Sequence, residues 1–262
     1  MTEMLQPGPA VALARLLDVE LPDLETDGLP LLWHWVYLLE RPRQADLGVE
    51  GHPVRGVIPV PPAPELRRMA AGGRVTRLAP LVVGSEATRR TEVVSTTDKE
   101  GRTGRLTFVV VRHTIDQDGA VKVVEEQDIV YRDAAATPTE AIEVAPAPLD
   151  ENDWSLPVDP TLLFRFSALT YNAHRIHYDR DYARDVEGYP GLLTHGPLQA
   201  LAMAEFVRRT GATATAIDYR LVSPLFDHQG LVVSSTGSGS VSVRDLGGRV
   251  TATGRVTVKG ME

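Results

Sequence analysis

The sequence predicts an α+β fold in each of two halves, with helices on one face of an antiparallel sheet. Both halves end in long segments rich in Val and Thr, and turn signals such as residues 98–101 and 116–119 separate these segments. Apolar residues at helical spacing precede each run of strands. Residues 134–160 contain five prolines, divide the chain almost equally and are interpreted as a linker.

In the first half, residues 8–40 are predicted to be helical. The two pieces are 11–17 and the apolar run 29–39, whose Trp33 and Trp35 are interpreted as core anchors. Residues 48–64 are rich in Gly and Pro and are predicted to form a loop. Strands are predicted at residues 81–83, 88–97, 104–115 and 121–132.

In the second half, a helix is predicted to begin near His195. Pro197 in its first turn wastes no hydrogen bond, and an apolar run continues to residue 207. Strands are predicted at 213–222, 231–243 and 249–259. The last strand alternates, which places Val250 and Ala252 on one face and Thr251 and Thr253 on the other.

The composition excludes several classes of protein. The 262 residues suffice for one large domain or two ordinary ones. A formal charge of −8 and a pI near 5.4 argue against nucleic-acid and anionic-membrane partners. The absence of Cys excludes disulfides and thiolate metal sites. Residues 1–7 lack the features of a secretory signal, and no apolar run is long enough to span a bilayer, so we expect a cytoplasmic protein.

Polar chemistry is concentrated in the stretch 171–178. Tyr171, Asn172, His174, Arg175 and His177 all lie within these eight positions. The helix that follows opens with Gly196, and the unpaired N–H groups of a helix start can face a ligand oxygen. A proton-transfer group and an oxyanion site are therefore expected close together.

These residues resemble a known family. FSALTYNAHRIHYD at 166–179, with LTHGPL at 193–198, is similar to the signature of MaoC-like (R)-specific enoyl-thioester hydratases and dehydratases. The similarity is greatest to the two-domain branch, which contains mitochondrial-type 3-hydroxyacyl-thioester dehydratase and the mesaconyl-CoA and itaconyl-CoA hydratases. The first half agrees through four segments, so that the resemblance covers nearly the whole chain: His34-Trp35, Gly51-His52-Pro53, Arg67-Arg68-Met69 with Gly72-Gly73, and EEQDIVYR at 125–132.

The resemblance implies a double hot-dog fold, in which two antiparallel sheets each wrap a central helix. Residues 1–140 would form a degenerate hot-dog domain that lends the wall of an acyl pocket, 141–160 a linker, and 161–262 the catalytic domain. The implied activity interconverts 2-enoyl and 3-hydroxyacyl thioesters of CoA or an acyl carrier, without a cofactor, in a homodimer. Short branched or dicarboxylic acyl groups such as mesaconyl and itaconyl are implied, with linear chains as the alternative.

The resemblance also assigns roles to single residues. Single-domain members of the superfamily use an Asp and a His five residues later, and the matching positions here are Asn172 and His177. His177 is therefore the expected acid–base residue and Asn172 the residue that orients water, because an amide cannot transfer the proton itself. The N–H of Gly196 is the expected oxyanion donor, and Tyr171 and His195 are expected to contact the substrate. The Asn departs from the broad pattern but fits the two-domain branch.

The residues alone leave alternatives open. Asn172 and His174 are also suited to capping turns, Gly196 to close packing, and His195 to a structural role. Arg175 either pairs with a substrate carboxylate or braces its loop against Asp179 or Asp181. The doublets Arg67-Arg68 and Arg208-Arg209 are candidate phosphate sites, but solvated surface is the default for such pairs and neither is assigned.

Two other functions compete with hydration. A thioester-binding protein without catalysis would explain why Asn replaces Asp at position 172. Hot-dog folds also include thioesterases, which commonly rely on a carboxylate near the helix. Asn172 offers no carboxylate, and Glu205 lies several residues inside the predicted helix.

Overall fold

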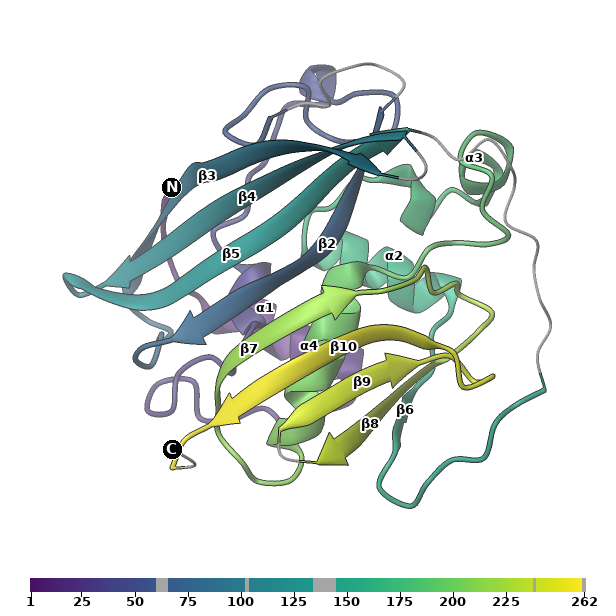
Figure 1. Cartoon of the computed structure of the whole chain (residues 1–262). Helices are drawn as coiled ribbons and strands as arrows, with labels where there is room; N and C mark the ends of the chain where they lie inside the picture. The colour runs from purple at the N-terminus through teal and green to yellow at the C-terminus, as the bar shows by residue number, and fades with distance from the viewer. Residues whose placement is uncertain (60–65, 102–103, 134–144, 238, 261–262) are drawn as a thin grey trace.

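The computed structural model describes residues 1–59, 66–101, 104–133, 145–237 and 239–260. Its strands form a ten-stranded antiparallel sheet in the order β1-β3-β4-β5-β2-β7-β10-β9-β8-β6 (Figure 1). The first half supplies β1 (Thr2–Met4), β2 (Leu66–Arg77), β3 (Glu86–Gly101), β4 (Gly104–Gln117) and β5 (Ala120–Asp133). The second half supplies β6 (Trp154–Leu156), β7 (Ala214–Leu221), β8 (Leu231–Gly237), β9 (Ser240–Arg244) and β10 (Val250–Val258).

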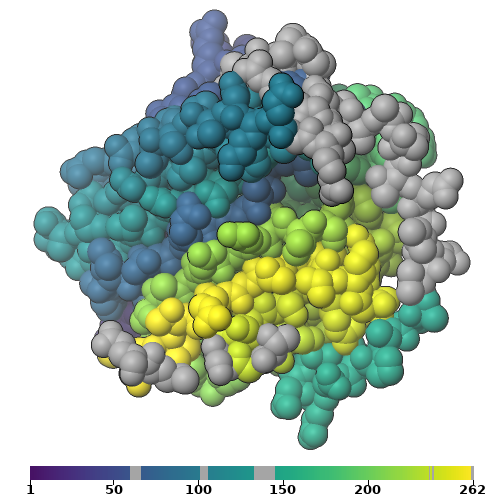
Figure 2. Space-filling view, in the orientation of Figure 1, coloured from purple at the N-terminus to yellow at the C-terminus, as the bar shows by residue number. Residues whose placement is uncertain are grey.

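Strands β2 and β7 pair along their edges, so the sheets of the two halves form one continuous sheet (Figures 1 and 2). At this seam Gly73 pairs with Tyr219. A Cβ at Gly73 would lie 2.6 Å from the carbonyl oxygen of Glu126 on β5, so only glycine fits between β5 and the Tyr219 side chain. The strand β2 was not predicted, because Arg-Arg-Met-Ala-Ala-Gly-Gly lacks the β-branched residues typical of strands.

The helices lie on one side of the sheet (Figure 1). They are α1 (Pro7–Leu17), α2 (Pro160–Leu169), α3 (Arg180–Asp185) and α4 (Gly196–Arg208), with 3-10 turns at Trp33–Val36, Gln44–Asp46 and Arg175–His177. The predicted helix near His195 is α4, which packs against β7 to β10. Among the other helices, α1 contacts α2 and the Trp33 turn, and α3 contacts the 3-10 turn Arg175–His177.

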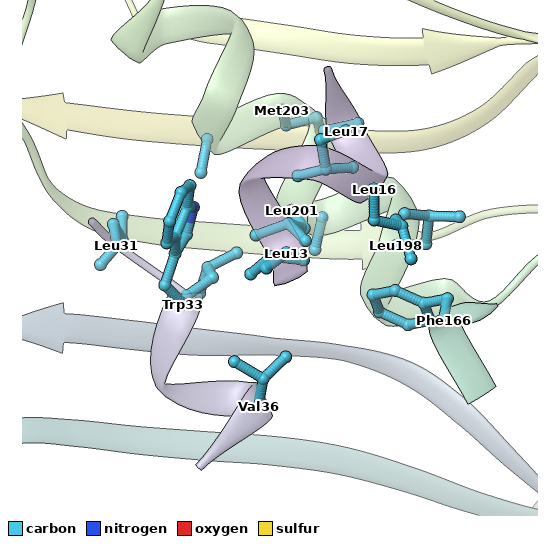
Figure 3. Close-up of a cluster of buried hydrophobic side chains, with 14 of the residues drawn as sticks. Leu13, Leu16, Leu17, Leu31, Trp33, Val36, Phe166, Leu198, Leu201 and Met203 are labelled. Atoms are coloured by element: carbon cyan, nitrogen blue, oxygen red, sulfur yellow. The ribbon is translucent and has the colours of Figure 1, made fainter. Parts of the chain in front are cut away.

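The core lies between these helices and the sheet (Figure 3). Leu13 of α1, Phe166 of α2 and Leu198 of α4 are almost fully buried in it. Trp33 is fully buried, as predicted, and its Nε1–H donates to Glu205 Oε1 at 2.7 Å. The wider run 29–39 is not the predicted helix, because Leu32 and Leu38 have positive φ angles of 73° and 52° that interrupt it.

Other expectations need correction. Residues 81–83 are not a strand, and the predicted strand 231–243 divides into β8 and β9. In the predicted linker, residues 134–144 lie outside the described part of the chain, while β6 pairs with β8 and α2 begins at Pro160. Thr251 was predicted on the opposite face from Ala252, but both are fully buried, and the chain shifts register between Val250 and Ala252. The Thr251 hydroxyl donates to Gln199 Oε1 at 2.7 Å.

Candidate active site

The 171–178 segment turns sharply as it leaves α2. Its φ angle of 53° places Tyr171 in the left-handed region, and the N–H of Asn172 donates back to the Ser167 carbonyl at 2.8 Å. The Asn172 side chain then closes a local turn, since its Oδ1 accepts the N–H of His174 at 3.0 Å. This is the capping role left open by the sequence. It occupies the amide oxygen of Asn172 and leaves the NH₂ group for other partners.

His177 ends the 3-10 turn Arg175–His177 and is buried, with 6% of its surface exposed. Its Nδ1 lies 2.7 Å from the Leu193 carbonyl oxygen, just ahead of α4. A carbonyl oxygen only accepts, so the proton of the neutral ring is on Nδ1 and Nε2 carries the lone pair. Burial lowers the pKa of His177 to about 4, and the Leu193 hydrogen bond opposes that shift. The ring is therefore neutral at pH 7.

His195 lies directly against His177. The two rings stack with centroids 3.6 Å apart and planes 19° from parallel. His195 is fully buried, its Nε2 is 2.8 Å from Ser167 Oγ, and its Nδ1 has no partner among the described residues. Burial, and then the nearby charge of His177, lower the pKa of His195 well below its ordinary value. His195 thus packs flat against the His177 ring.

Gly196 is the first residue of α4. A Cβ there would lie 2.2 Å from Leu221 Cδ1, so any larger residue at this position would require the Leu221 side chain to move. Gly196 directly follows His195, whose ring stacks on that of His177. Close packing and an oxyanion role are compatible here, because both use the small size of the residue.

A loop of the first half is clamped onto this segment. The N–H of Arg175 donates to the Glu50 carbonyl at 2.8 Å. Gly51 has a φ angle of 95°, and a Cβ on it would lie only 1.8 Å from the carbonyl oxygen of Ala173. The next residue, His52, packs its ring on His174 with centroids 4.1 Å apart. Residues 50–52 therefore complete the site from the other half of the chain.

An open cavity of about 590 Å³ lies between the two halves at this point. The second half contributes Ser167, Asn172 and the half-exposed Tyr171, among others, whereas His177, His195 and Gly196 are not lining residues. His177 lies behind the wall, in contact with His174 at a centroid distance of 5.5 Å. The first half contributes most of the remaining wall, namely Leu39, Glu40, Pro42, Gln44, Leu47, Gly51, His52, Pro53, Arg55, Gly56, Ile58, Arg68, Arg89, His113 and Gln127.

Arg175 is occupied by its own loop. Nε and Nη2 donate to Asp179 Oδ2 at 3.0 and 2.7 Å, and Nη1 donates to the Val49 carbonyl at 3.1 Å. The guanidinium also lies over the Tyr182 ring, 4.1 Å from its centroid. This is the bracing arrangement considered above. Arg175 is not among the residues that line the cavity.

The sequence did not reveal a second polar cluster, which is buried under the first-half wall. Its centre is Glu125, whose carboxylate meets His34 Nε2 at 2.9 Å and accepts from Trp35 Nε1 and Gln127 Nε2. Burial alone raises the pKa of Glu125, but the hydrogen bond and charge of His34 lower it to about 2. The signal was present in the sequence, since Glu125 and Gln127 alternate in register with the inward-facing Val123.

Comparison with known proteins identifies the family. The family described as hydroxyacyl-thioester dehydratase type 2 matches residues 32–227. The chain belongs to this family. It is 47% identical over 203 residues to mesaconyl-C(4)-CoA hydratase of Chloroflexus aurantiacus, which covers 76% of this chain and 71% of that protein. Identity to the mitochondrial hydroxyacyl-thioester dehydratase type 2 of Schizosaccharomyces pombe is 35% over 96 residues, 34% of this chain and 32% of the relative.

Solved structures agree with the fold of this dehydratase family. A MaoC-like dehydratase from Phytophthora capsici superposes with a TM-score of 0.67 at 15% identity, covering 98% of this chain and 94% of the other. HtdX from Mycobacterium tuberculosis gives 0.66 at 14% identity, covering 98% of both chains. The predicted hot-dog fold and MaoC-like family are confirmed, as is the hydratase or dehydratase class at the level of the family. Within the described residues, no helix combines the length and apolar character needed to cross a membrane.

Proposed function

We propose that this member of the dehydratase type 2 family interconverts 2-enoyl and 3-hydroxyacyl thioesters, with His177 as its single proton-transfer residue. The observation that carries the proposal is the hydrogen bond from His177 Nδ1 to the Leu193 carbonyl, in a ring that is neutral at pH 7. This bond fixes the tautomer and leaves the Nε2 lone pair to act as a base.

In hydration, Nε2 takes one proton from water while the water oxygen bonds to C3 of the enoyl group. The electron pair of the C2–C3 double bond moves toward the thioester, whose oxygen becomes an enolate. The enolate then collapses, and C2 takes the proton from Nε2, which restores the neutral ring. The reverse sequence removes water, so one histidine serves in both directions.

Two further groups assist this step. The NH₂ group of Asn172 is left to hold the attacking water, because its oxygen is bonded to the His174 N–H. The N–H of Gly196, at the start of α4, is the proposed donor to the enolate oxygen, where the helix dipole also favours negative charge. Since His177 does not line the cavity, the proposal requires that the wall opens enough for the reacting carbons to reach its Nε2.

The acyl group is proposed to be short and to include carboxylated chains. The relative with 47% identity is named for a hydratase of mesaconyl-C(4)-CoA, a branched dicarboxylic thioester. We further propose that residues 161–262 form the catalytic domain and that residues 1–140 shape the acyl pocket, as expected from the sequence. The homodimer and the cytoplasmic location stay predictions, which size-exclusion chromatography with light scattering and fractionation of cells would test.

A spectroscopic assay with crotonyl-CoA tests the activity. Loss of the absorbance of the conjugated thioester, with no release of free thiol, is the expected result. Thiol release would indicate a thioesterase, and neither change on any enoyl-CoA would indicate a binding protein. The thioesterase is disfavoured by the structure, because the buried Glu205 carboxylate is already bonded to Trp33 and to Arg208.

A further inference from the structure

The cavity is lined by an arginine, Arg68, that has no ion-pair partner among the described residues. Arg68 pairs in register with Tyr131 across β2 and β5, so the two side chains share the inner face of the sheet, and Arg68 lines the cavity. Its guanidinium makes no hydrogen bond or ion pair with the described residues. By contrast, the preceding residue, Arg67, holds Glu187 at 2.9 Å.

The position of Arg68 is electrostatically costly. Its side chain is half-buried, and desolvation lowers the pKa of the guanidinium. Glu40, Glu50 and Tyr131 act on it only at longer range. Burying a guanidinium without a hydrogen-bonded counter-ion is unfavourable, so such a residue in an open cavity is suited to a ligand anion.

Arg68 also lies on the reaction side of the cavity. Its positive charge contributes, after burial, to the lowered pKa values of His52 and His174. The rings of these two histidines are in contact, and His174 in turn contacts His177. Arg68 and His52 therefore line the same cavity, and two ring contacts lead from His52 to the proposed base.

The rest of the first-half wall combines polar and apolar residues. Gln127 and His113 line the cavity beside the apolar Ile58 and Leu47. Arg89 also lines it, but Nη2 of Arg89 is bonded to Glu40 Oε1 at 3.2 Å and its Nε is buried without a partner. A long alkyl chain gains little from such a wall, whereas a small branched chain that ends in an anion would use both its apolar and its polar parts.

We propose that Arg68 binds a carboxylate at the far end of a short enoyl chain, as a planar two-pronged donor. This assignment rests on the proposed hydratase function and names its specificity residue. It differs from the assignment to Arg175, whose donors are taken by Asp179 and by the backbone. With the carboxylate fixed at Arg68, C2 and C3 of the chain are directed toward the His177 side of the cavity.

The test compares thioesters that differ only by a carboxylate in place of a methyl group. Fumaryl-CoA and crotonyl-CoA are compared by kcat/KM, and the unreactive succinyl-CoA and butyryl-CoA are compared by Kd in calorimetry. The variants are Arg68→Met and Arg68→Lys. Arg90→Met is the matched control, because Arg90 is a largely exposed arginine on β3 that pairs with Asp116 and does not line the cavity.

The expected result is selective. Arg68→Met lowers kcat/KM for fumaryl-CoA and weakens succinyl-CoA binding by about 100-fold, as for a buried charge pair that loses one partner. The kcat/KM for crotonyl-CoA and the Kd for butyryl-CoA change by less than about threefold. Arg68→Lys retains the charge but loses the two-pronged geometry. Its kcat/KM for fumaryl-CoA and its affinity for succinyl-CoA should therefore lie between those of the parent and of Arg68→Met. Arg90→Met matches the parent on all four thioesters.

Three outcomes would overturn the assignment. Equal losses on all four thioesters would place Arg68 at the CoA phosphates or in the scaffold. A selective loss in Arg89→Met but not in Arg68→Met would move the carboxylate site to Arg89. If the parent protein shows no preference for the carboxylated thioester of each pair, no carboxylate-binding residue is needed. Failure of the proposed function is distinct, because the parent would then hydrate neither enoyl-CoA, while the two saturated thioesters would still report binding.

Discussion

Acid should destabilise this protein well above the pH at which most folded proteins denature. His174, His177 and His195 are all buried in one ring cluster, and burial lowers the pKa of each. In the unfolded chain the same groups titrate near 6.5. Below that pH the unfolded state binds more protons than the folded state, so stability is intact above about pH 6.5 and is lost as the pH falls.

The magnitude follows from the number of buried rings. Each histidine that stays neutral in the folded state costs about 1.4 kcal/mol per pH unit below 6.5, so three cost about 4 kcal/mol between pH 7.5 and 5.5. That is a large part of a typical unfolding free energy of about 5–15 kcal/mol. His52 and His113, whose pKa values burial also lowers, act in the same direction, while Glu187, whose pKa burial raises, opposes them.

Urea unfolding at pH 7.5, 6.5 and 5.5 measures this effect, with tryptophan fluorescence and circular dichroism as independent probes. His174→Asn removes one titrating ring from the cluster and should reduce the loss by about 1.4 kcal/mol. If the parent loses less than about 1 kcal/mol over this range, the rings are charged or solvated in the folded protein and the argument for a neutral His177 is refuted.

The other predictions concern single side chains of the site. Gly51→Ala should lower the melting temperature and the activity more than Gly84→Ala does, because both glycines have positive φ angles but only Gly51 lies against a backbone carbonyl. The positive φ angle alone costs about 1–2 kcal/mol in either variant. Equal shifts of the melting temperature in calorimetry would show that the contact between Gly51 and Ala173 does not matter. Asn172→Ala should lower kcat about tenfold, less than loss of the proton-transfer residue, because it removes only a water-orienting group; a larger loss than in His177→Ala, measured with crotonyl-CoA, would reverse the two roles. Arg175→Lys should lower kcat/KM equally for crotonyl-CoA and fumaryl-CoA, as expected of a brace bonded to Asp179; a loss confined to fumaryl-CoA would return the carboxylate site to Arg175.

The features that the sequence predicted well are those that local pattern determines. Helix α4 was located from a proline in its first turn and an apolar run, and the long strands β3 to β5 from β-branched residues and turns. The segment 171–178 was expected beside the start of α4, and the bond from His177 to the Leu193 carbonyl places it there.

The features that were missed depend on pairing across the chain. Strand β2 has neighbours on both edges, and this pairing overrides its weak strand propensity. The same pairing directs Arg68 into the cavity, although solvated surface is the usual default for an arginine doublet. His52 reaches the site only because Gly51 fits against Ala173, a contact between residues more than a hundred positions apart. Local periodicity carries no information about such contacts.

The most direct test of the central claim is the hydration rate of His177→Ala with crotonyl-CoA. Folding is checked by circular dichroism, and thioester binding by calorimetry with butyryl-CoA. Positioned acid–base groups contribute about 10²- to 10⁴-fold, so kcat should fall by that range while butyryl-CoA binding stays near that of the parent. A folded variant that hydrates crotonyl-CoA at close to the parental kcat would contradict the assignment of His177 as the proton-transfer residue.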